Sequence, residues 1–250
     1  MISEKNYLLL LDSATEVCSA ALGRSDGTIV AEREELTPNR HSELLALFAD
    51  ELLREIPGGT KAGLRAVVVS EGPGSYTGLR IGASYTKGIC WSLGLPLVTI
   101  PTTEALALAF LLDPHSKRCR EQYPDALLLP MIDARRMEVY AALYDGEARE
   151  IPGSGTRALV LTDERDREIL AGLADHRPLL FFGNGAEKAV PVMGELFGSR
   201  AAFCPGITAR SGAMLARGFE RLEKGETADI GYWTPFYLKE FQATTPRKKY

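Results

Sequence analysis

The chain has 250 residues, with 29 Lys and Arg against 33 Asp and Glu, so its formal net charge is −4. Hydrophobic residues make up 45% and charged residues 25% of the chain, which are ordinary globular proportions and exclude disordered and fibrous architectures. A mildly acidic chain lacks the broad basic surface that stand-alone nucleic-acid binding needs. Any role with nucleic acid would therefore require a partner.

The spacing of the cysteines and the length of the apolar runs exclude further classes of protein. The four cysteines form no C-x-x-C pair, which argues against a zinc ribbon and against a disulfide framework. The longest apolar run, residues 105–112, has 8 residues, whereas crossing a bilayer takes roughly 20. The apolar run at 7–11 is too short for a signal peptide. We therefore expect a cytoplasmic protein without a membrane segment.

The first half of the chain predicts a mixed sheet with crossover helices. Its elements in order are strands over 7–11, 17–22 and 28–33, a helix from about 42 to 56, a buried strand over 66–70, a helix to 93, a strand over 96–100 and a helix to 112. The first three strands are joined by short turns and must pair antiparallel. The later strands alternate with helices, as in parallel crossover units.

The second half begins in the same order as the first. Its elements are strands over 128–132 and 138–144, a helix over 163–174, a strand over 179–182 and a helix over 209–224. At an offset of 121 residues Asp12 aligns with Asp133, and the tripeptide Ala-Ala-Leu at 20–22 aligns with the same tripeptide at 141–143. Together with the matching order of strands and turns, these identities indicate a duplicated α/β architecture.

A polar segment with two prolines separates the halves. The predicted organisation is an N-terminal subdomain over 1–112, a linker over 113–125, a C-terminal subdomain over 126–238 and a tail over 239–250. The tail ends in a short basic run, which we interpret as a solvated end.

A glycine-rich segment, residues 70–80, lies between a buried strand and a helix, where backbone N–H groups can hold an anion. It is neither a P-loop, since no Gly-Lys-Ser/Thr closes it, nor a dinucleotide fingerprint, since its glycines stand one residue too far apart. Gly72 and Gly74, with Asp12 and Thr15 of the first hairpin turn, are the candidate nucleotide contacts. The alternative is that these residues only build sharp turns.

No catalytic constellation stands out elsewhere. The three histidines form no H-x-x-x-H or H-E-x-x-H pair, and Ser70 and Ser75 lack the G-x-S-x-G elbow of a serine nucleophile. The turn at 133–136, Asp-Ala-Arg-Arg, is either an anion site or a solvated turn.

Glycines inside one predicted helix call for a packing reason. Gly78, Gly82 and Gly88 each cost about 1 kcal/mol relative to alanine in a helix interior. Close approach of another helix is the usual compensation, and that helix belongs either to this chain or to a second protein. The leucine excess of the 42–56 helix suggests that the two helices present an apolar face outward, as in a dimer interface.

Five segments of this sequence together resemble the TsaB (YeaZ) family: LDSATEVCSAAL at 11–22, RHSELL at 40–45, EGPGSYTGLR at 71–80, IDAR at 132–135 and PFYL at 235–238. The resemblance is dense over 7–145 and sparse afterwards. It implies an actin/Hsp70/sugar-kinase-like (ASKHA) fold of two related subdomains, in agreement with the repeat. It also implies a part in the threonylcarbamoylation of adenosine 37 of tRNA, as the non-catalytic dimerisation partner of a TsaD-like catalytic subunit. A TsaE-like ATPase would join that pair, and tRNA would be bound through the complex.

The resemblance assigns the partner contact to the helices at about 42–56 and 76–93. The candidate contact residues are Leu44, Leu45, Phe48, Tyr76, Leu79, Ala83 and Ser84. On this view Ala83→Arg should abolish the heterodimer and leave the monomer folded. By alignment Thr102 and Leu106 occupy the positions of the metal-binding histidines of TsaD-like chains, so the resemblance implies no catalytic metal. It implies no intrinsic cofactor, and it leaves open ATP or ADP with Mg²⁺ at a partner interface and a homodimer in isolation.

Two enzyme classes compete with this non-enzymatic scaffold function. One is a free-standing ATP-binding phosphotransferase of the ASKHA fold that uses Asp12, Thr15 and the glycine-rich segment. The other is a glycoprotease-type hydrolase, which needs a metal or a nucleophile–base pair that the sequence does not supply.

Overall fold

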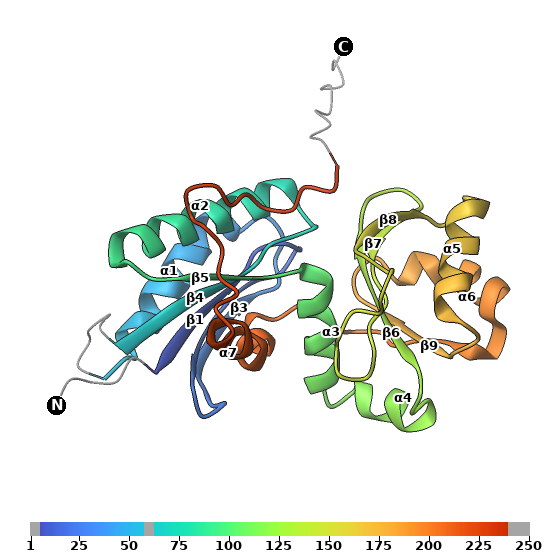
Figure 1. Ribbon diagram of the computed structural model, residues 1–250. Coiled ribbons are helices and arrows are strands. Elements are labelled where there is room, and N and C mark those ends of the chain that lie inside the picture. Colours follow the sequence, from blue (N-terminus) through green and yellow to red (C-terminus); the bar gives the residue numbers. More distant parts are fainter. Residues whose placement is uncertain (1–5, 58–62, 240–250) are drawn as a thin grey trace, which may run out of the picture.

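Two five-stranded sheets organise the molecule, and each forms the centre of one lobe (Figure 1). The computed structural model describes residues 6–57 and 63–239. The strand order is β3-β2-β1-β4-β5 in the first sheet and β8-β7-β6-β9-β10 in the second. The two orders match strand by strand, so β6 corresponds to β1 and β9 to β4. In each lobe the first three strands pair antiparallel and the last two pair parallel. The predicted duplicated α/β architecture, the ASKHA fold, is confirmed.

The strands are β1 (Tyr7–Asp12), β2 (Cys18–Arg24), β3 (Ile29–Glu35), β4 (Leu64–Ser70), β5 (Leu97–Ile100), β6 (Leu127–Asp133), β7 (Glu138–Ala141), β8 (Arg157–Val160), β9 (Leu179–Phe182) and β10 (Ala201–Phe203). The helices are α1 (His41–Arg54), α2 (Tyr76–Leu93), α3 (Thr102–Leu112), α4 (Ser116–Gln122), α5 (Glu164–Ala174), α6 (Val190–Phe197) and α7 (Leu215–Glu223). Short 3₁₀ turns are η2 (Glu187–Ala189), η3 (Gly198–Arg200) and η4 (Ser211–Met214). Within these described residues no helix is long and apolar enough to cross a membrane.

The central strand of each sheet is buried on both faces, which explains its unbroken apolar run. In β1, Leu9 and Leu11 face a core cluster built with α1 and α2, and Leu8 and Leu10 face a second cluster built with η4 and α7. In the second lobe α5 and α6 cover one face of the sheet, and α3 covers the other. The helix pairs α1–α2 and α5–α6 therefore hold equivalent places in the two lobes.

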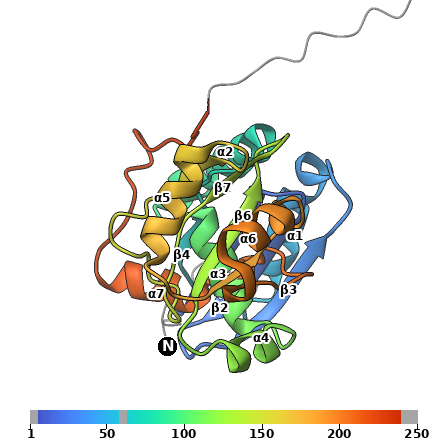
Figure 2. The same ribbon diagram turned by 90° about the vertical axis from the view of Figure 1, so that its right-hand side faces the viewer.

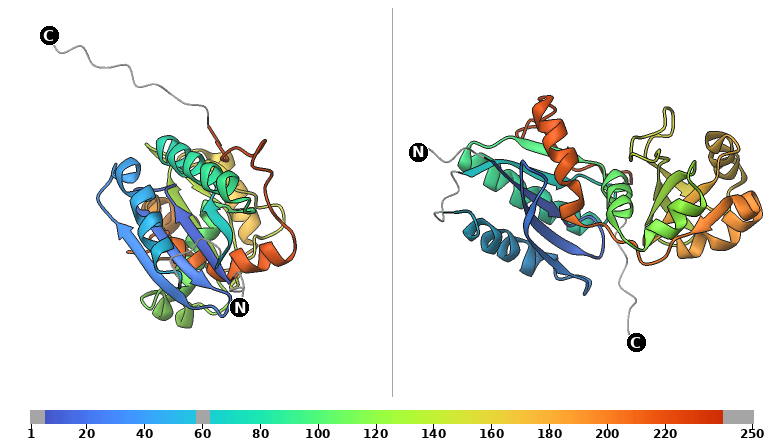
Figure 3. Two further views of the ribbon diagram at one scale, coloured as in Figure 1. Left: turned by 90° about the vertical axis from the view of Figure 1, so that its left-hand side faces the viewer. Right: turned by 90° about the horizontal axis from the view of Figure 1, so that it is seen from below.

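The C-terminal part of the chain returns to the first lobe, which differs from the predicted boundary. Helix α7 lies beside the first sheet (Figure 3). Its Leu215 and Phe219 pack in the same core cluster as β1 and β4, and Ala228 forms a β-bridge with Leu97. Residues 211–228 therefore pack with the first sheet, although the predicted C-terminal subdomain over 126–238 includes them. The apolar face of a helix predicts that it is buried, but it does not predict which sheet buries it. The predicted linker over 113–125 also holds a helix, α4.

A buried carboxylate ties α3 to the returning helix. Glu104 of α3 forms ion pairs with Arg217, at 2.7 Å, and with Arg221 of α7, at 2.5 Å. Burial raises the pKa of Glu104, and the two guanidinium groups oppose that rise. Arg217 also donates to the backbone carbonyls of Glu147 and Ala148 in the second lobe, so α7 contacts both lobes.

Candidate functional site

The glycine-rich segment lies directly against the first hairpin turn. A Cβ at Gly74 would stand 2.1 Å from the carbonyl oxygen of Ala14, and one at Gly78 would stand 2.0 Å from that of Ser13. The Ser75 N–H donates to the Ala14 carbonyl at 2.7 Å, and the Ser13 hydroxyl donates to the Gly78 carbonyl at 2.9 Å. Only glycine permits two backbones to approach so closely. Gly74 and Gly78 therefore allow the glycine-rich segment to pack directly on the hairpin turn.

Asp12, Thr15, Gly72 and Gly74, the candidate nucleotide contacts, are brought near one another, and several of their polar atoms form hydrogen bonds within the chain. Asp12 is fully buried, and one carboxylate oxygen accepts from the Ser70 hydroxyl at 2.7 Å and from the Ala14 N–H at 2.9 Å. Thr15 accepts from the N–H of Val17, and the Gly72 N–H donates to the hydroxyl of Thr102.

These contacts give a physical test of the nucleotide hypothesis. A phosphate needs free N–H donors, and those of Gly72, Ser75 and Gly78 already have acceptors. The second oxygen of Asp12 is buried without a hydrogen-bond partner in the described structure, and burial raises the pKa of this carboxyl. Three N–H groups of the segment are thus already engaged within the chain, and we derive no step through ATP or Mg²⁺.

Thr102 and Leu106 are both buried and serve packing. Thr102 accepts the Gly72 N–H, and Leu106 lies in the core cluster on the inner face of the second sheet. Among the residues that the structure describes, no three His, Cys, Asp or Glu side chains gather as a metal site.

The seven predicted partner contacts divide by exposure. Leu45, Leu79 and Ala83 are buried in this chain, so they have little surface to offer a partner. Leu44, Phe48 and Tyr76 are partly buried, and Ser84 is exposed. Tyr76 packs against Tyr237 with ring centroids 5.1 Å apart, and Arg80 lies 4.8 Å from the Tyr76 centroid. Four of the seven predicted residues therefore keep surface that a partner could reach.

The contacts around the three glycines of α2 differ. Gly78 contacts Ser13 as described, and a Cβ at Gly82 would lie 2.4 Å from the Ser13 hydroxyl oxygen, so both glycines are explained by contacts inside the chain. A Cβ at Gly88 would meet no described atom within 4 Å. Nothing in the described chain explains a glycine at position 88.

Gly88 lies in an exposed stripe that the sequence prediction missed in part. Ser84, Gly88 and Ser92 follow one another at helical spacing, and beside them the side chain of Trp91 is 80% exposed. On the neighbouring helix Leu47 is 48% exposed. Spacing from Gly88 would have found this stripe. We call the following set the α1–α2 face: Leu44, Leu47, Phe48, Ile81, Ser84, Tyr85, Gly88, Trp91 and Ser92. Figure 3 shows α1 and α2 side by side.

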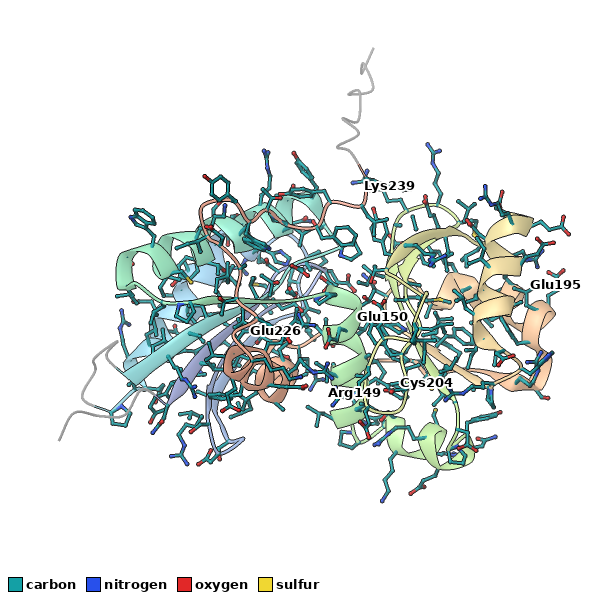
Figure 4. All side chains as sticks on the ribbon, viewed as in Figure 1. Arg149, Glu150, Glu195, Cys204, Glu226 and Lys239 are labelled. Carbon is teal, nitrogen blue, oxygen red and sulfur yellow. The ribbon has the colours of Figure 1, made fainter. Side chains whose placement is uncertain are left out.

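Residues 230–239, called the strap below, cross α2 and end at the second lobe. The Phe236 N–H donates to the Glu71 carbonyl at 2.7 Å, and the Trp233 indole N–H donates to the Glu71 carboxylate at 3.4 Å. Lys239 forms an ion pair with Glu138 of β7, and Figure 4 shows Lys239 between the two lobes. The late PFYL motif therefore covers the glycine-rich segment.

Several known proteins are similar to this chain in sequence or in fold. A profile of the family described as "TsaD: tRNA N6-adenosine threonylcarbamoyltransferase" matches residues 30–159. The protein named tRNA threonylcarbamoyladenosine biosynthesis protein TsaB of Bacillus subtilis is 28% identical over 94% of this chain and 95% of its own length. The protein of the same name from Escherichia coli is 28% identical over 93% of this chain and 94% of its own length.

One solved structure shows how far the fold likeness extends. A Pseudomonas aeruginosa protein, described as similar to peptidase YEAZ, superposes with a TM-score of 0.70 at 22% identity, over 94% of this chain and 100% of its own. The profile covers more than half of the chain, and the two TsaB proteins match it over nearly their full length. With its glycine-rich segment, duplicated sheets and returning C-terminal segment, the chain belongs to the TsaB (YeaZ) family.

Proposed function

We propose that this chain is a non-catalytic subunit in the biosynthesis of threonylcarbamoyladenosine in tRNA, and that its α1–α2 face binds and activates a TsaD-like catalytic subunit. The names of the two TsaB relatives support the pathway. The replacement of the metal histidines by Thr102 and Leu106 supports assigning the chemistry to the partner. A TsaE-like ATPase would join this pair, and tRNA would be bound through the assembled complex.

The observation that carries the proposal is an apolar helix surface that nothing in the described chain covers. Helix α2 has 18 residues, of which only Arg80 and Lys87 are charged. It leaves Trp91 largely exposed next to Gly88, where no described atom fills the space above the backbone. A large exposed aromatic beside a small-residue stripe suits a helix that approaches closely and buries the ring.

The neighbouring helix supports the same partner. Leu44, Leu47 and Phe48 lie at helical spacing on α1, and α1 contacts α2. Two adjacent helices can receive two helices of a partner, with side chains of one pair packed into the grooves of the other. A partner with the same fold carries an equivalent helix pair.

The test uses two matched glycines. Gly88→Arg places a long cation on the α1–α2 face, and Gly172→Arg places the same side chain on α5, where a Cβ likewise meets nothing within 4 Å. Affinity for the TsaD-like protein of the same genome is measured by titration calorimetry. We expect Gly88→Arg to weaken binding at least tenfold, which is about 1.4 kcal/mol, and Gly172→Arg to leave it unchanged.

A control must show that a variant with weaker binding is still folded. Circular dichroism and thermal unfolding of both variants should match the parent, since both positions are exposed. Equal affinities for the parent and Gly88→Arg would refute the proposed face. A parent chain that forms no complex at concentrations well above micromolar would refute the subunit function itself. Gly88→Arg replaces Ala83→Arg as the test, because Ala83 is buried and its substitution would disturb the fold.

A further inference from the structure

The turn between β6 and β7 carries two consecutive arginines in an uncommon backbone conformation. Arg135 has φ 68° and Arg136 has φ 49°, the left-handed region that residues with a side chain rarely adopt. The turn is closed by bonds between the backbones of Ala134 and Glu138 and of Glu138 and Arg135. Lys188 donates to the Arg136 carbonyl at 2.8 Å. The fold thus fixes the backbone beneath two exposed guanidinium groups.

The two acidic side chains beside this turn form ion pairs with lysines and not with the arginines. The carboxylate of Asp133 pairs with Lys188, and that of Glu138 pairs with Lys239. Within residues 6–57 and 63–239 neither Arg135 nor Arg136 has a carboxylate partner or a side-chain hydrogen bond. An acidic chain therefore displays two uncompensated positive charges at one point.

The strap carries two aromatic residues and ends at the arginine turn. Its Leu238 packs on the same second-lobe core cluster as Ala134, and Lys239 binds Glu138 at the base of the turn (Figure 4). The preceding Phe236 and Tyr237 are 43% and 37% exposed. Tyr237 packs at a tilted angle against Tyr76 of α2, beside Arg80, and Lys239 two residues later pairs with Glu138 of β7. We call Arg80, Phe236, Tyr237, Arg135 and Arg136 the rim.

We infer that the rim is a contact surface for single-stranded RNA. Guanidinium groups bind phosphate oxygens in pairs of hydrogen bonds, and exposed rings stack with bases that are not already stacked in a duplex. The small number of cations fits a limited contact of a few phosphates, which agrees with the chain's negative net charge. The identity of the RNA as a tRNA loop rests on the proposed function, whereas the contact itself does not.

The first experiment measures anisotropy of a fluorescein-labelled 17-nucleotide RNA hairpin with a seven-nucleotide loop, titrated with the purified chain at several salt concentrations. The double variant Arg135→Gln/Arg136→Gln removes both charges of the turn. Its matched control, Arg118→Gln/Arg165→Gln, removes two exposed arginines of α4 and α5 for which the described structure shows no ion pair. We expect the turn variant to bind at least about tenfold more weakly and its log–log salt slope to be shallower by about 1.4, the value for two phosphates of a single strand.

The control pair should keep most of the parent's affinity. An equal loss in both double variants would mean non-specific attraction and would overturn the inference. Unchanged affinity of the turn variant would overturn it as well.

A second variant tests the aromatic part of the rim. Phe236→Leu keeps an apolar side chain at the strap but removes the ring. We expect it to bind the hairpin about threefold more weakly and to lose the preference for the hairpin over a blunt RNA duplex of equal length. A parent chain that prefers the duplex would overturn the single-strand assignment.

The two proposals fail separately. Arginine-turn variants should still bind the TsaD-like protein with the parent's affinity, and Gly88→Arg should still bind the hairpin. Loss of partner binding in the turn variant would move the arginines into the protein interface and overturn the RNA contact.

Discussion

The two helix pairs α1–α2 and α5–α6 hold the same place in the two lobes but present different surfaces (Figure 2). Helix α5 begins with five charged residues in succession, and its Arg167 pairs with Glu195 of α6 across the outer surface. Helix α2 has only two charged residues, and no ion pair joins it to α1 in the described structure. The same fold position is thus strongly charged in one lobe and largely apolar in the other, and the apolar pair is the one that we propose binds a partner.

The glycines of the two lobes can be compared in the same way. Gly74 and Gly78 press the glycine-rich segment onto the β1–β2 turn, and Gly183 and Gly185 press the equivalent segment after β9 onto β6 and its turn. These four are parts of the duplicated framework. Gly88 of α2 has no such role in the described chain, and neither do Gly172 of α5 and Gly194 of α6. The lobes differ instead in the side chain beside Gly88, where Trp91 is largely exposed.

The largest effect is expected where the framework itself is broken. Gly78→Ala would place a methyl group 2.0 Å from the Ser13 carbonyl oxygen. Because neither backbone can yield easily, we expect the free energy of unfolding to fall by about 3 kcal/mol, measured by urea denaturation. A loss below 0.5 kcal/mol would show that the segment and the turn are not held together.

The next effect concerns the partner surface. Trp91→Ala should weaken binding to the TsaD-like protein by about 2 kcal/mol, because a buried tryptophan commonly dominates an interface. Val190→Ala on α6 trims an exposed apolar side chain at the other helix pair and should leave the affinity unchanged. Titration calorimetry of both variants checks the contrast, and equal effects would remove the difference between the pairs.

The buried Asp12 should make the stability of the chain depend on pH. Burial raises the pKa of Asp12. The folded chain therefore retains the Asp12 proton above the unfolded value of 3.8, and the stability that this proton provides is lost as pH rises from there through the folded pKa.

Asn cannot ionise, so the stability of Asp12→Asn relative to the parent should increase with pH over that window, by about 1.4 kcal/mol for each unit by which folding raises the pKa. Denaturation of the parent and Asp12→Asn between pH 4 and 8 measures this difference, and a flat difference would contradict the buried carboxyl.

The smallest effect separates stability from binding. Gly88→Ala and Gly172→Ala should each stabilise the isolated chain by about 0.5–1 kcal/mol, since both are exposed helix positions with open space. Only Gly88→Ala should change the affinity for the partner. Thermal unfolding and calorimetry of the same samples would show whether the two glycines differ.

Local patterns predicted much of this fold. Short turns between apolar strands and the repeat from Asp12 to Asp133 indicated a duplicated mixed sheet, because pairing of neighbouring strands is a local property. The return of α7 to the first lobe was not predictable, since an amphipathic helix fits either sheet.

The surface of α2 was only partly predictable for a related reason. Apolar residues occur around the whole helix, so spacing did not separate Leu79 and Ala83, which face the core, from Trp91, which does not. The contacts of Gly78 and Gly82 with Ser13 join distant parts of the chain and could not be derived from sequence.

The most direct measurement of the central claim is hydroxyl-radical footprinting of the chain with and without the TsaD-like protein. The method reports side-chain accessibility, and Trp91 of α2 and Val190 of α6 start exposed. We predict that the partner strongly reduces the oxidation of Trp91 and also reduces that of Leu47, while Val190 is unchanged. Unchanged oxidation of Trp91 in a complex that has demonstrably formed, or protection of Val190 in its place, would contradict the account.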